Sequence, residues 1–392
     1  MARFLPFSPQ IIAFFAAVAV YAVLGSPTPD RIGAVEAVIA GLLVVAFWKP
    51  AFMTLRRVHF PSVFLVGGLS VPTFVGILYG HPASLILRDV AAFLFLSLPI
   101  LGQNLWFAHT DETREGRFRY GLCAGFACLG LLFSLRSLLD LHLLAPAPLT
   151  YFANMPSVLF TALVCPFLAF YTPTQSWIQP LGLAGLSLLL LLPVMAMGLT
   201  LQRAPLAYWG VFTGGLLLMS MRASPQRVLV IAGLIALIGA LFYAQLWDVA
   251  WALWDKTRVH GGNMRVAEWQ AVLATIGDGL PSALFGTGWG GTFSSPAVAD
   301  IRVNFTHSLL SSLLLKTGLV GFGFAIFYLG WIGQHLVSIF KKDRLVGFML
   351  FGPLFISIFL YASYKSFDFG YLLLLIVVLG RGEVIETERG AR

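Results

Sequence analysis

Apolar runs of nearly the length that crosses a bilayer recur along the whole of this 392-residue chain. A helix needs roughly 20 mostly apolar residues to span the hydrocarbon core, where backbone hydrogen bonds must be satisfied within helices or closed barrels. The composition agrees, because only 11% of the residues are charged, against about 25% in soluble proteins. We therefore expect an all-α, polytopic integral membrane protein that contacts membrane lipids.

The apolar runs predict about twelve transmembrane helices. The last run is shorter than a full crossing and has Asp368 near its start, which indicates a tilted helix or one that continues its neighbour. The predicted spans are 10–25, 32–48, 60–79, 90–107, 118–139, 155–172, 178–200, 204–221, 227–246, 307–331, 345–363 and 367–380. They divide the chain into a first block of nine spans (1–246), a long polar loop (247–306) and a last block of three spans with a short tail (307–392).

The larger part of the 25 Lys and Arg residues lies in loops on the side of the N-terminus. Positive residues collect in cytoplasmic loops, so both termini are expected in the cytoplasm and the long loop outside it. No basic run is dense enough to follow a nucleic acid backbone. Six outer cations gather in or beside two consecutive outer loops, which favours an anion-binding site there: Arg203, Lys256, Arg258, Arg265, Arg302 and Lys316.

The long loop has recognisable local elements. It opens with a one-sided stripe of Trp247, Trp251 and Trp254 that suits a membrane interface. After the Gly261-Gly262 break, Asn263 can cap a helix over Met264 to Ile276. The predicted apolar face of that helix is Val266, Trp269, Val272, Leu273 and Ile276. The glycine-rich run 286–291 predicts irregular backbone that leads back toward the next span.

His307 is the first candidate for chemistry, because an imidazole at the outer end of a span can accept a proton from a sugar hydroxyl. The alternative is an interfacial histidine that only bonds a neighbouring helix. Arg203, in a short outer turn, and Arg265 are the second candidates, since guanidinium binds phosphate oxygens in pairs. For Arg203, extension to the membrane surface is an equally good explanation.

The glycine run could aim backbone N–H groups at an anion, but a tight reversal of the loop is the simpler interpretation. It does not match a nucleotide-binding loop. Lys316 lies inside a span and must face a cavity or a partner, which could be an acid. The outer acids Asp30, Asp89, Glu268 and Asp278 could serve as base or metal ligands instead. None of them forms a cluster with metal-ligand spacing, and we expect no metal and no other cofactor.

These residues, taken in order, resemble the O-antigen ligase and polymerase superfamily of bacterial inner-membrane glycosyltransferases. The resemblance covers roughly residues 198–330 and rests on the outer-turn Arg203, Arg265-Val-Ala-Glu-Trp269, Leu284-Phe-Gly-Thr-Gly-Trp-Gly290, and His307 opening a span that contains Leu313-Leu-Leu-Lys-Thr-Gly318. Two positions depart from the family pattern. Ser308 stands where asparagine is common, and Lys316 stands where an acidic residue is common.

The resemblance implies a GT-C-like fold and a metal-independent, inverting transfer of a glycan from an undecaprenyl-pyrophosphate carrier at the periplasmic face of the inner membrane. Arg203 and Arg265 would bind the pyrophosphate and His307 would position or deprotonate the acceptor hydroxyl. Arg302, Gly288 and Trp289 complete the set of candidate substrate-binding residues.

The expected reaction is that of an O-antigen ligase, with the sugar of lipid A core as acceptor in lipopolysaccharide biosynthesis. A polymerase, with a second carrier-linked glycan as acceptor, is the alternative within enzymes. A lipid-glycan transporter would also have about a dozen spans, but we would then expect ionisable residues near mid-membrane and repeated halves.

Overall fold

In the computed structural model, nearly all of the regular structure is helical. The structure describes residues 8–26, 33–55, 60–102, 112–143, 149–171, 191–223, 243–260 and 264–390, with the isolated positions 225, 228, 229 and 233. Before the long loop, the elements are α1 (Pro9–Leu24), α2 (Ala34–Leu55), α3 (Phe60–Leu78), α4 (Ala83–Leu96), α5 (Leu98–Gly102), α6 (Glu112–Leu143), η1 (Leu149–Asn154), α7 (Pro156–Tyr171) and α9 (Arg203–Ala223). The loop and the last block hold α11 (Tyr243–His260), α12 (Met264–Ile276), α13 (Leu280–Phe285), β1 (Phe293–Ser295), η2 (Pro296–Val298), β2 (Ile301–Val303), α14 (Leu309–Lys342), α15 (Arg344–Phe359), η3 (Ala362–Lys365) and α16 (Phe367–Gly390).

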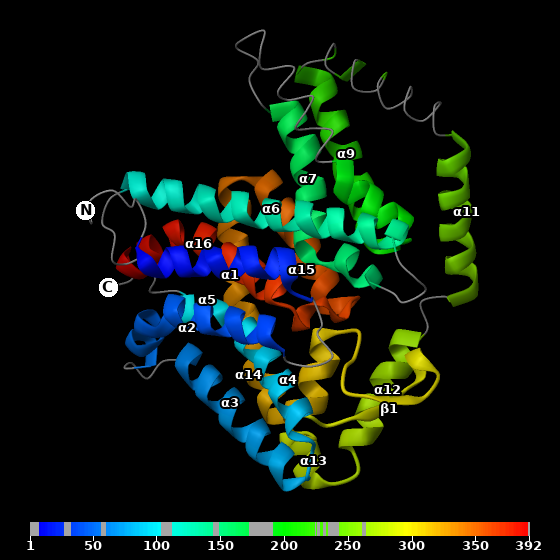
Figure 1. Cartoon of the computed structure of the whole chain (residues 1–392). Coiled ribbons are helices and arrows are strands. Elements are labelled where there is room, and N and C mark those ends of the chain that lie inside the picture. The colour runs from blue at the N-terminus through cyan, green and yellow to red at the C-terminus, as the bar shows by residue number, and fades with distance from the viewer. Residues whose placement is uncertain are drawn as a thin grey trace.

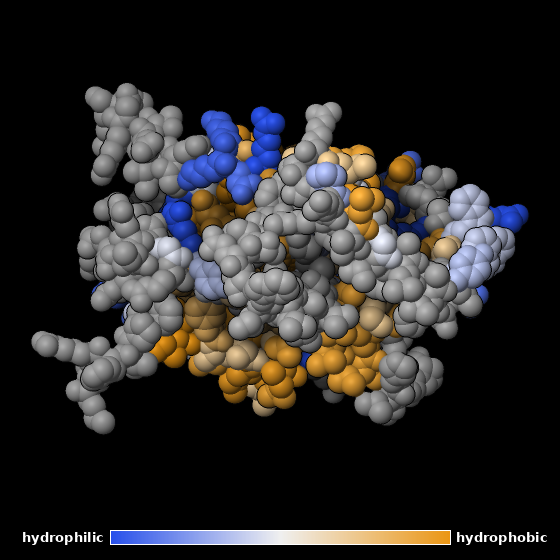
Figure 2. All heavy atoms as spheres, turned by 90° about the horizontal axis from the view of Figure 1, so that it is seen from above, coloured by the Kyte–Doolittle hydropathy of each residue, from blue (hydrophilic) through white to orange (hydrophobic). Residues whose placement is uncertain are grey.

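Within the described residues, five helices are long and apolar enough to cross a membrane: α2, α3, α6, α9 and α14. Three further helices, α1, α7 and α15, are apolar but shorter. Large apolar side chains lie at the surface, such as Val211 at 77% and Phe327 at 73% exposed, and Figure 2 shows broad apolar areas on the face seen from above. Apolar surface of this extent is typical of contact with lipid, and the chain is a membrane-embedded all-α protein.

Most of the predicted spans coincide with a helix, but the span predicted at 90–107 is divided. There α4 begins earlier, at Ala83, and ends at Leu96. Ser97, whose N–H still donates to Phe93, separates it from α5, which starts at Leu98. Pro99 has no amide hydrogen to donate to Phe95, which explains why the ladder fails here. Residues 103–107 and most of the predicted spans 178–200 and 227–246 lie outside the described residues.

The centre of the molecule is α16, whose residues 371–378 are all buried. A helix that is apolar on every side belongs in the middle of a bundle. Figure 1 shows α1, α6 and α16 side by side, with α14 and α15 against the same core. Contacts join α6 to α1 and to α16, and α16 to α14 and to α15, while aromatic rings join α1 to α16. The start of α1 and the end of α16 lie at the same end of this bundle (Figure 1).

Two proline–tryptophan pairs fix a helix against a distant segment, a loop in one case and another helix in the other. Pro72 inside α3 cannot donate to Gly68, and the indole N–H of Trp289 donates to that carbonyl at 3.0 Å. Pro166 inside α7 leaves the carbonyl of Ala162 without its helical donor in the same way. The indole of Trp209, on α9, donates to it at 3.1 Å. Each proline therefore creates an acceptor that one distant tryptophan satisfies.

The loop forms one helix with the predicted bounds and a small hairpin that was not predicted. The helix is α12, and its buried residues are Glu268, Val272 and Ile276, whereas Val266 is 60% and Leu273 is 52% exposed. The predicted face was therefore right at Val272 and Ile276, which are buried, and at Trp269, which packs against them, and wrong at Val266 and Leu273. Glu268 joins the buried side because its carboxylate has partners outside the helix. The hairpin pairs β1 with β2 in antiparallel register.

The glycine run packs into a break in α14. Gly318 has φ +61° and ψ −166°, which interrupts the ladder of α14 one-third of the way along it. The backbone N–H of Thr287 donates to Leu315 at 2.8 Å, and that of Gly288 donates to Lys316 at 3.0 Å. Carbonyls released by the break are thus satisfied from the loop. A Cβ at Gly286 would lie 2.5 Å from the nitrogen of Gly318, so this contact requires glycine.

Candidate functional site

His307 lies in the segment between β2 and α14 and is held by a buried carboxylate. Glu268 on α12 is 1% exposed, and one of its oxygens accepts from the backbone N–H of His307 at 3.0 Å. The other oxygen lies 3.0 Å from His307 Nδ1 and accepts from the Ser295 hydroxyl at 3.1 Å. The His307 side chain keeps 24% of its surface exposed. Both its backbone and its ring are therefore oriented by one residue.

This contact decides which ring nitrogen of His307 is available. An ionised carboxylate only accepts hydrogen bonds, so opposite Glu268 the proton of a neutral imidazole resides on Nδ1. The lone pair is then on Nε2, which is the arrangement of a general base oriented by an acid. Burial raises the pKa of Glu268, and the Ser295 hydroxyl and the nearby charge of Arg265 oppose that rise.

Arg265 links this pair to the end of α15. It lies one helical turn before Glu268, with Nη1 4.0 Å from the carboxylate, and its Nη2 donates to the carbonyl of Leu360 at 2.9 Å. The side chain is 35% exposed. Burial lowers the pKa of Arg265 and the neighbouring charge of Glu268 raises it, but guanidinium stays charged at any physiological pH. A permanent positive charge therefore stands beside His307.

Arg203 brings a second permanent charge to the same place. It is the first residue of α9, and its charge acts on Arg265 and on Tyr361. Tyr361 is hydrogen-bonded to the backbone of Ala204, the residue that follows Arg203, and lies near the charges of both arginines. The positive end of the α9 dipole adds to the two guanidinium groups. Together they place positive charge near the Glu268–His307 pair.

Of the sequence-predicted residues, Arg265 and His307 are joined through Glu268, and Arg203 lies near Arg265 and Tyr361. Sequence reasoning placed Glu268 among the outer acids but did not find its bond to His307, and it did not find Tyr361. The spacing of Glu268, Val272 and Ile276 at i, i+4 and i+8 is the signal that a carboxylate shares the buried face of α12.

A second charged cluster forms around Asp89 and contacts the segment that leads to His307. Asp89 is 3% exposed and accepts from Lys316 Nζ at 2.6 Å, from Lys365 Nζ at 3.2 Å and from the backbone of Gly290 at 2.8 Å. Lys365 also donates to the carbonyl of Asn304 at 3.0 Å, so the cluster anchors the strand that leads to His307. The prediction that Lys316 pairs with an acid is confirmed.

The other candidate residues lie elsewhere. Trp289 is 4% exposed, its indole is bonded to Gly68, and its backbone N–H donates to Pro72 at 2.8 Å. A Cβ at Gly288 would lie 2.3 Å from the nitrogen of Gly76. These contacts make both residues part of the packing of the loop on α3. Arg302 lies exposed on β2, opposite Ser294. Substrate binding by these three residues stays a prediction.

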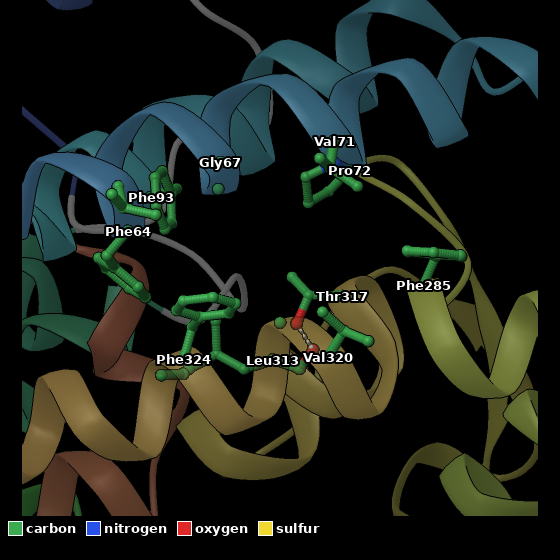
Figure 3. A pocket seen from close by; sticks show the side chains of 14 residues that line it. Phe64, Gly67, Val71, Pro72, Phe93, Phe285, Leu313, Thr317, Val320 and Phe324 are labelled. Carbon is green, nitrogen blue, oxygen red and sulfur yellow. Dashed lines mark hydrogen bonds between the residues drawn. The ribbon is translucent and has the colours of Figure 1, made fainter. Parts of the chain in front are cut away.

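An apolar cavity of about 130 Å³ lies between α3 and α14 (Figure 3). Phe64, Phe93, Phe285 and Phe324 contribute rings to its wall, and the one hydroxyl, that of Thr317, is bonded to Leu313 at 2.7 Å. A cavity of about 30 Å³ adjoins Asp89 and Lys365. In the part of the chain that the structure describes, no three His, Cys, Asp or Glu side chains gather to hold a metal ion.

No family model matches the chain, and no curated protein matches it. The geometry of the site therefore carries the functional argument, with the motif resemblance as its only guide to the substrates.

Proposed function

We propose that this protein is a glycosyltransferase whose donor leaves as a pyrophosphate, and specifically an O-antigen ligase. It would transfer a polysaccharide from undecaprenyl pyrophosphate to a sugar hydroxyl of lipid A core. The observation that supports the reaction type is the convergence of Arg203 and Arg265 beside the Glu268–His307 pair. The identities of the carrier and the acceptor rest on the motif resemblance.

In the proposed reaction, His307 Nε2 takes the proton of the acceptor hydroxyl while that oxygen attacks the anomeric carbon of the donor. The bond from this carbon to the pyrophosphate oxygen breaks, and its electron pair leaves with the pyrophosphate. Arg203 and Arg265 stabilise the charge that develops there. Loss of one well-placed donor of this kind costs about 2.7–4 kcal/mol of barrier in other enzymes. Attack from the face opposite the leaving group inverts the anomeric centre.

The proposal includes a topology that goes beyond the five long apolar helices. The chain would have twelve spans in a GT-C-like arrangement within a bacterial inner membrane. Both termini would be cytoplasmic. The segment 247–306 and His307 would then face the periplasm, where carrier-linked glycans are available.

The test is transfer by purified protein in lipid nanodiscs, supplied with carrier-linked glycan and lipid A core, with and without a chelator. We expect the wild type to modify the core in both conditions, and His307→Ala and Arg265→Ala to lose transfer. Arg344→Ala is the matched control. Arg344 is exposed at the junction of α14 and α15, at the other end of α14 from His307, and its replacement should leave the rate unchanged.

Three results would count against the proposal. A donor that lengthens while the core stays unmodified would replace the ligase with a polymerase. Activity that disappears with the chelator would show that the arginines do not neutralise the leaving group alone. Full activity of the His307 and Arg265 variants would remove the mechanism altogether.

A further inference from the structure

The aromatic residues of α11 form one exposed stripe. Tyr243, Trp247, Trp251 and Trp254 recur every three or four residues, which places them on one side of a helix. Their exposed fractions are 65%, 58%, 63% and 64%. Most large aromatic side chains in globular proteins are extensively buried, so four exposed ones on one helix indicate a surface that meets something else.

The charges of α11 are sorted around the same axis. Asp248 follows Trp247 and Asp255 follows Trp254, so each carboxylate lies about 100° round the helix from the preceding indole. Arg258 lies four residues after Trp254 and seven after Trp251, and therefore belongs to the aromatic side. These three residues are exposed. Lys256, the fourth charged residue of α11, lies about 180° round the helix from Trp247. The aromatic side thus ends in Arg258, the two carboxylates lie about a quarter turn from it, and a second cation lies on the opposite side.

The position of α11 leaves this side open. Figure 1 shows α11 apart from the bundle, at the end where α12 lies, with its axis across the direction of α6. No other described helix or strand packs extensively against it.

We propose that α11 binds the surface of the bilayer that the chain itself spans, with its aromatic side at the level of the lipid headgroups. Tryptophan and tyrosine favour this depth, because the ring is apolar and its N–H or O–H reaches the polar layer. Arg258 meets lipid phosphate, and Asp248 and Asp255 face water. The cation on the aromatic side, Arg258, favours a phosphate-bearing surface over an apolar groove on another protein.

This contact has a consequence for the site. α12, which carries Arg265 and Glu268, begins only four residues after α11 ends. A helix held at headgroup depth therefore sets the height of the arginine above the membrane. The lipid surface acts as a positioning element for α12, whatever the substrate is.

The test measures the depth of two positions in the full-length protein, with Cys123, Cys128 and Cys165 replaced by serine and the chain placed in phosphatidylglycerol-containing nanodiscs. A nitroxide label is attached to Trp254→Cys, on the aromatic side, or to Asp248→Cys as the matched control. Accessibility to molecular oxygen, which enters lipid, is compared with accessibility to a water-soluble nickel chelate. If Trp254→Cys does not fold, Trp251→Cys takes its place.

We expect oxygen to dominate at position 254 and the nickel chelate to dominate at position 248. We also expect Arg258→Gln to shift position 254 toward the nickel chelate. Equal access of the chelate to both positions would overturn the proposal. Protection of position 254 from both reagents would also overturn it, because the stripe would then be covered by protein or by a second copy of the chain.

Discussion

Replacement of Glu268 by glutamine tests whether this buried side chain selects the reactive nitrogen of His307. Glutamine keeps the shape of the side chain but turns one oxygen into an amide donor. If the amide met the backbone N–H of His307, two donors would face each other at 3.0 Å, at a cost of about 1–3 kcal/mol. The amide therefore faces Nδ1. The ring then accepts there and carries its hydrogen on Nε2, and the base is lost.

A positioned general base contributes about 10²–10⁴-fold, which corresponds to about 2.7–5.4 kcal/mol of barrier. We expect kcat of Glu268→Gln for glycan transfer to fall by this factor, with donor binding retained because both arginines remain. Asp278→Asn is the control, since Asp278 is an exposed carboxylate shortly after α12. Adding His307→Ala to Glu268→Gln should cost little more than either change alone. A wild-type kcat in Glu268→Gln, or additive losses in the double variant, would refute the reasoning.

Three further results follow from the structure. Burial raises the pKa of Glu268 above its ordinary 4.5, so the folded chain binds this proton more tightly than the unfolded chain does. The free energy of unfolding, measured in denaturant, should therefore fall as the pH rises from 4.5 through the raised pKa, and it should fall less steeply in Glu268→Gln. Gly318→Ala should lower thermal stability by about 1–3 kcal/mol because its φ and ψ suit glycine alone, whereas Gly323→Ala, which meets open space on the same helix, should not. Asp89→Asn leaves two buried ammonium groups without their carboxylate and should cost about 3–5 kcal/mol in thermal unfolding, more than Lys316→Met, which leaves a one-to-one pair.

Local patterns predicted the parts of the fold that depend on neighbours in sequence. The apolar runs predicted helices, and a capping residue and a periodic pattern predicted α12 from Met264 to Ile276, as found. The pattern of α12 predicted that Val272 and Ile276 would be buried, but not that Glu268 would join them. The burial of Glu268 depends on Ser295 and His307, which approach its carboxylate from outside the helix.

The sequence did not predict the break at Gly318 or the role of Trp289, because both depend on contacts with distant segments of the chain. A glycine inside an apolar run looks like an ordinary helix position until the segment that packs against it is known. Trp289 looked like a substrate-binding residue because it lies in a glycine-rich loop. Its actual acceptor is a carbonyl more than two hundred residues earlier in the chain.

The two proline–tryptophan pairs bear on how a helix in lipid selects the segment that packs against it. Apolar surface does little to select a neighbour in lipid, because lipid tails solvate a leucine side chain as well as another helix does. A carbonyl freed by Pro72 or Pro166 is different, since leaving it without a donor in hydrocarbon is expensive and only a donor at one height satisfies it. The indoles of Trp289 and Trp209 supply that donor. Each freed carbonyl therefore specifies where its partner must lie along the helix. Replacement of the tryptophan alone would leave the carbonyl without a donor, and replacement of the proline alone would leave the indole N–H without its acceptor.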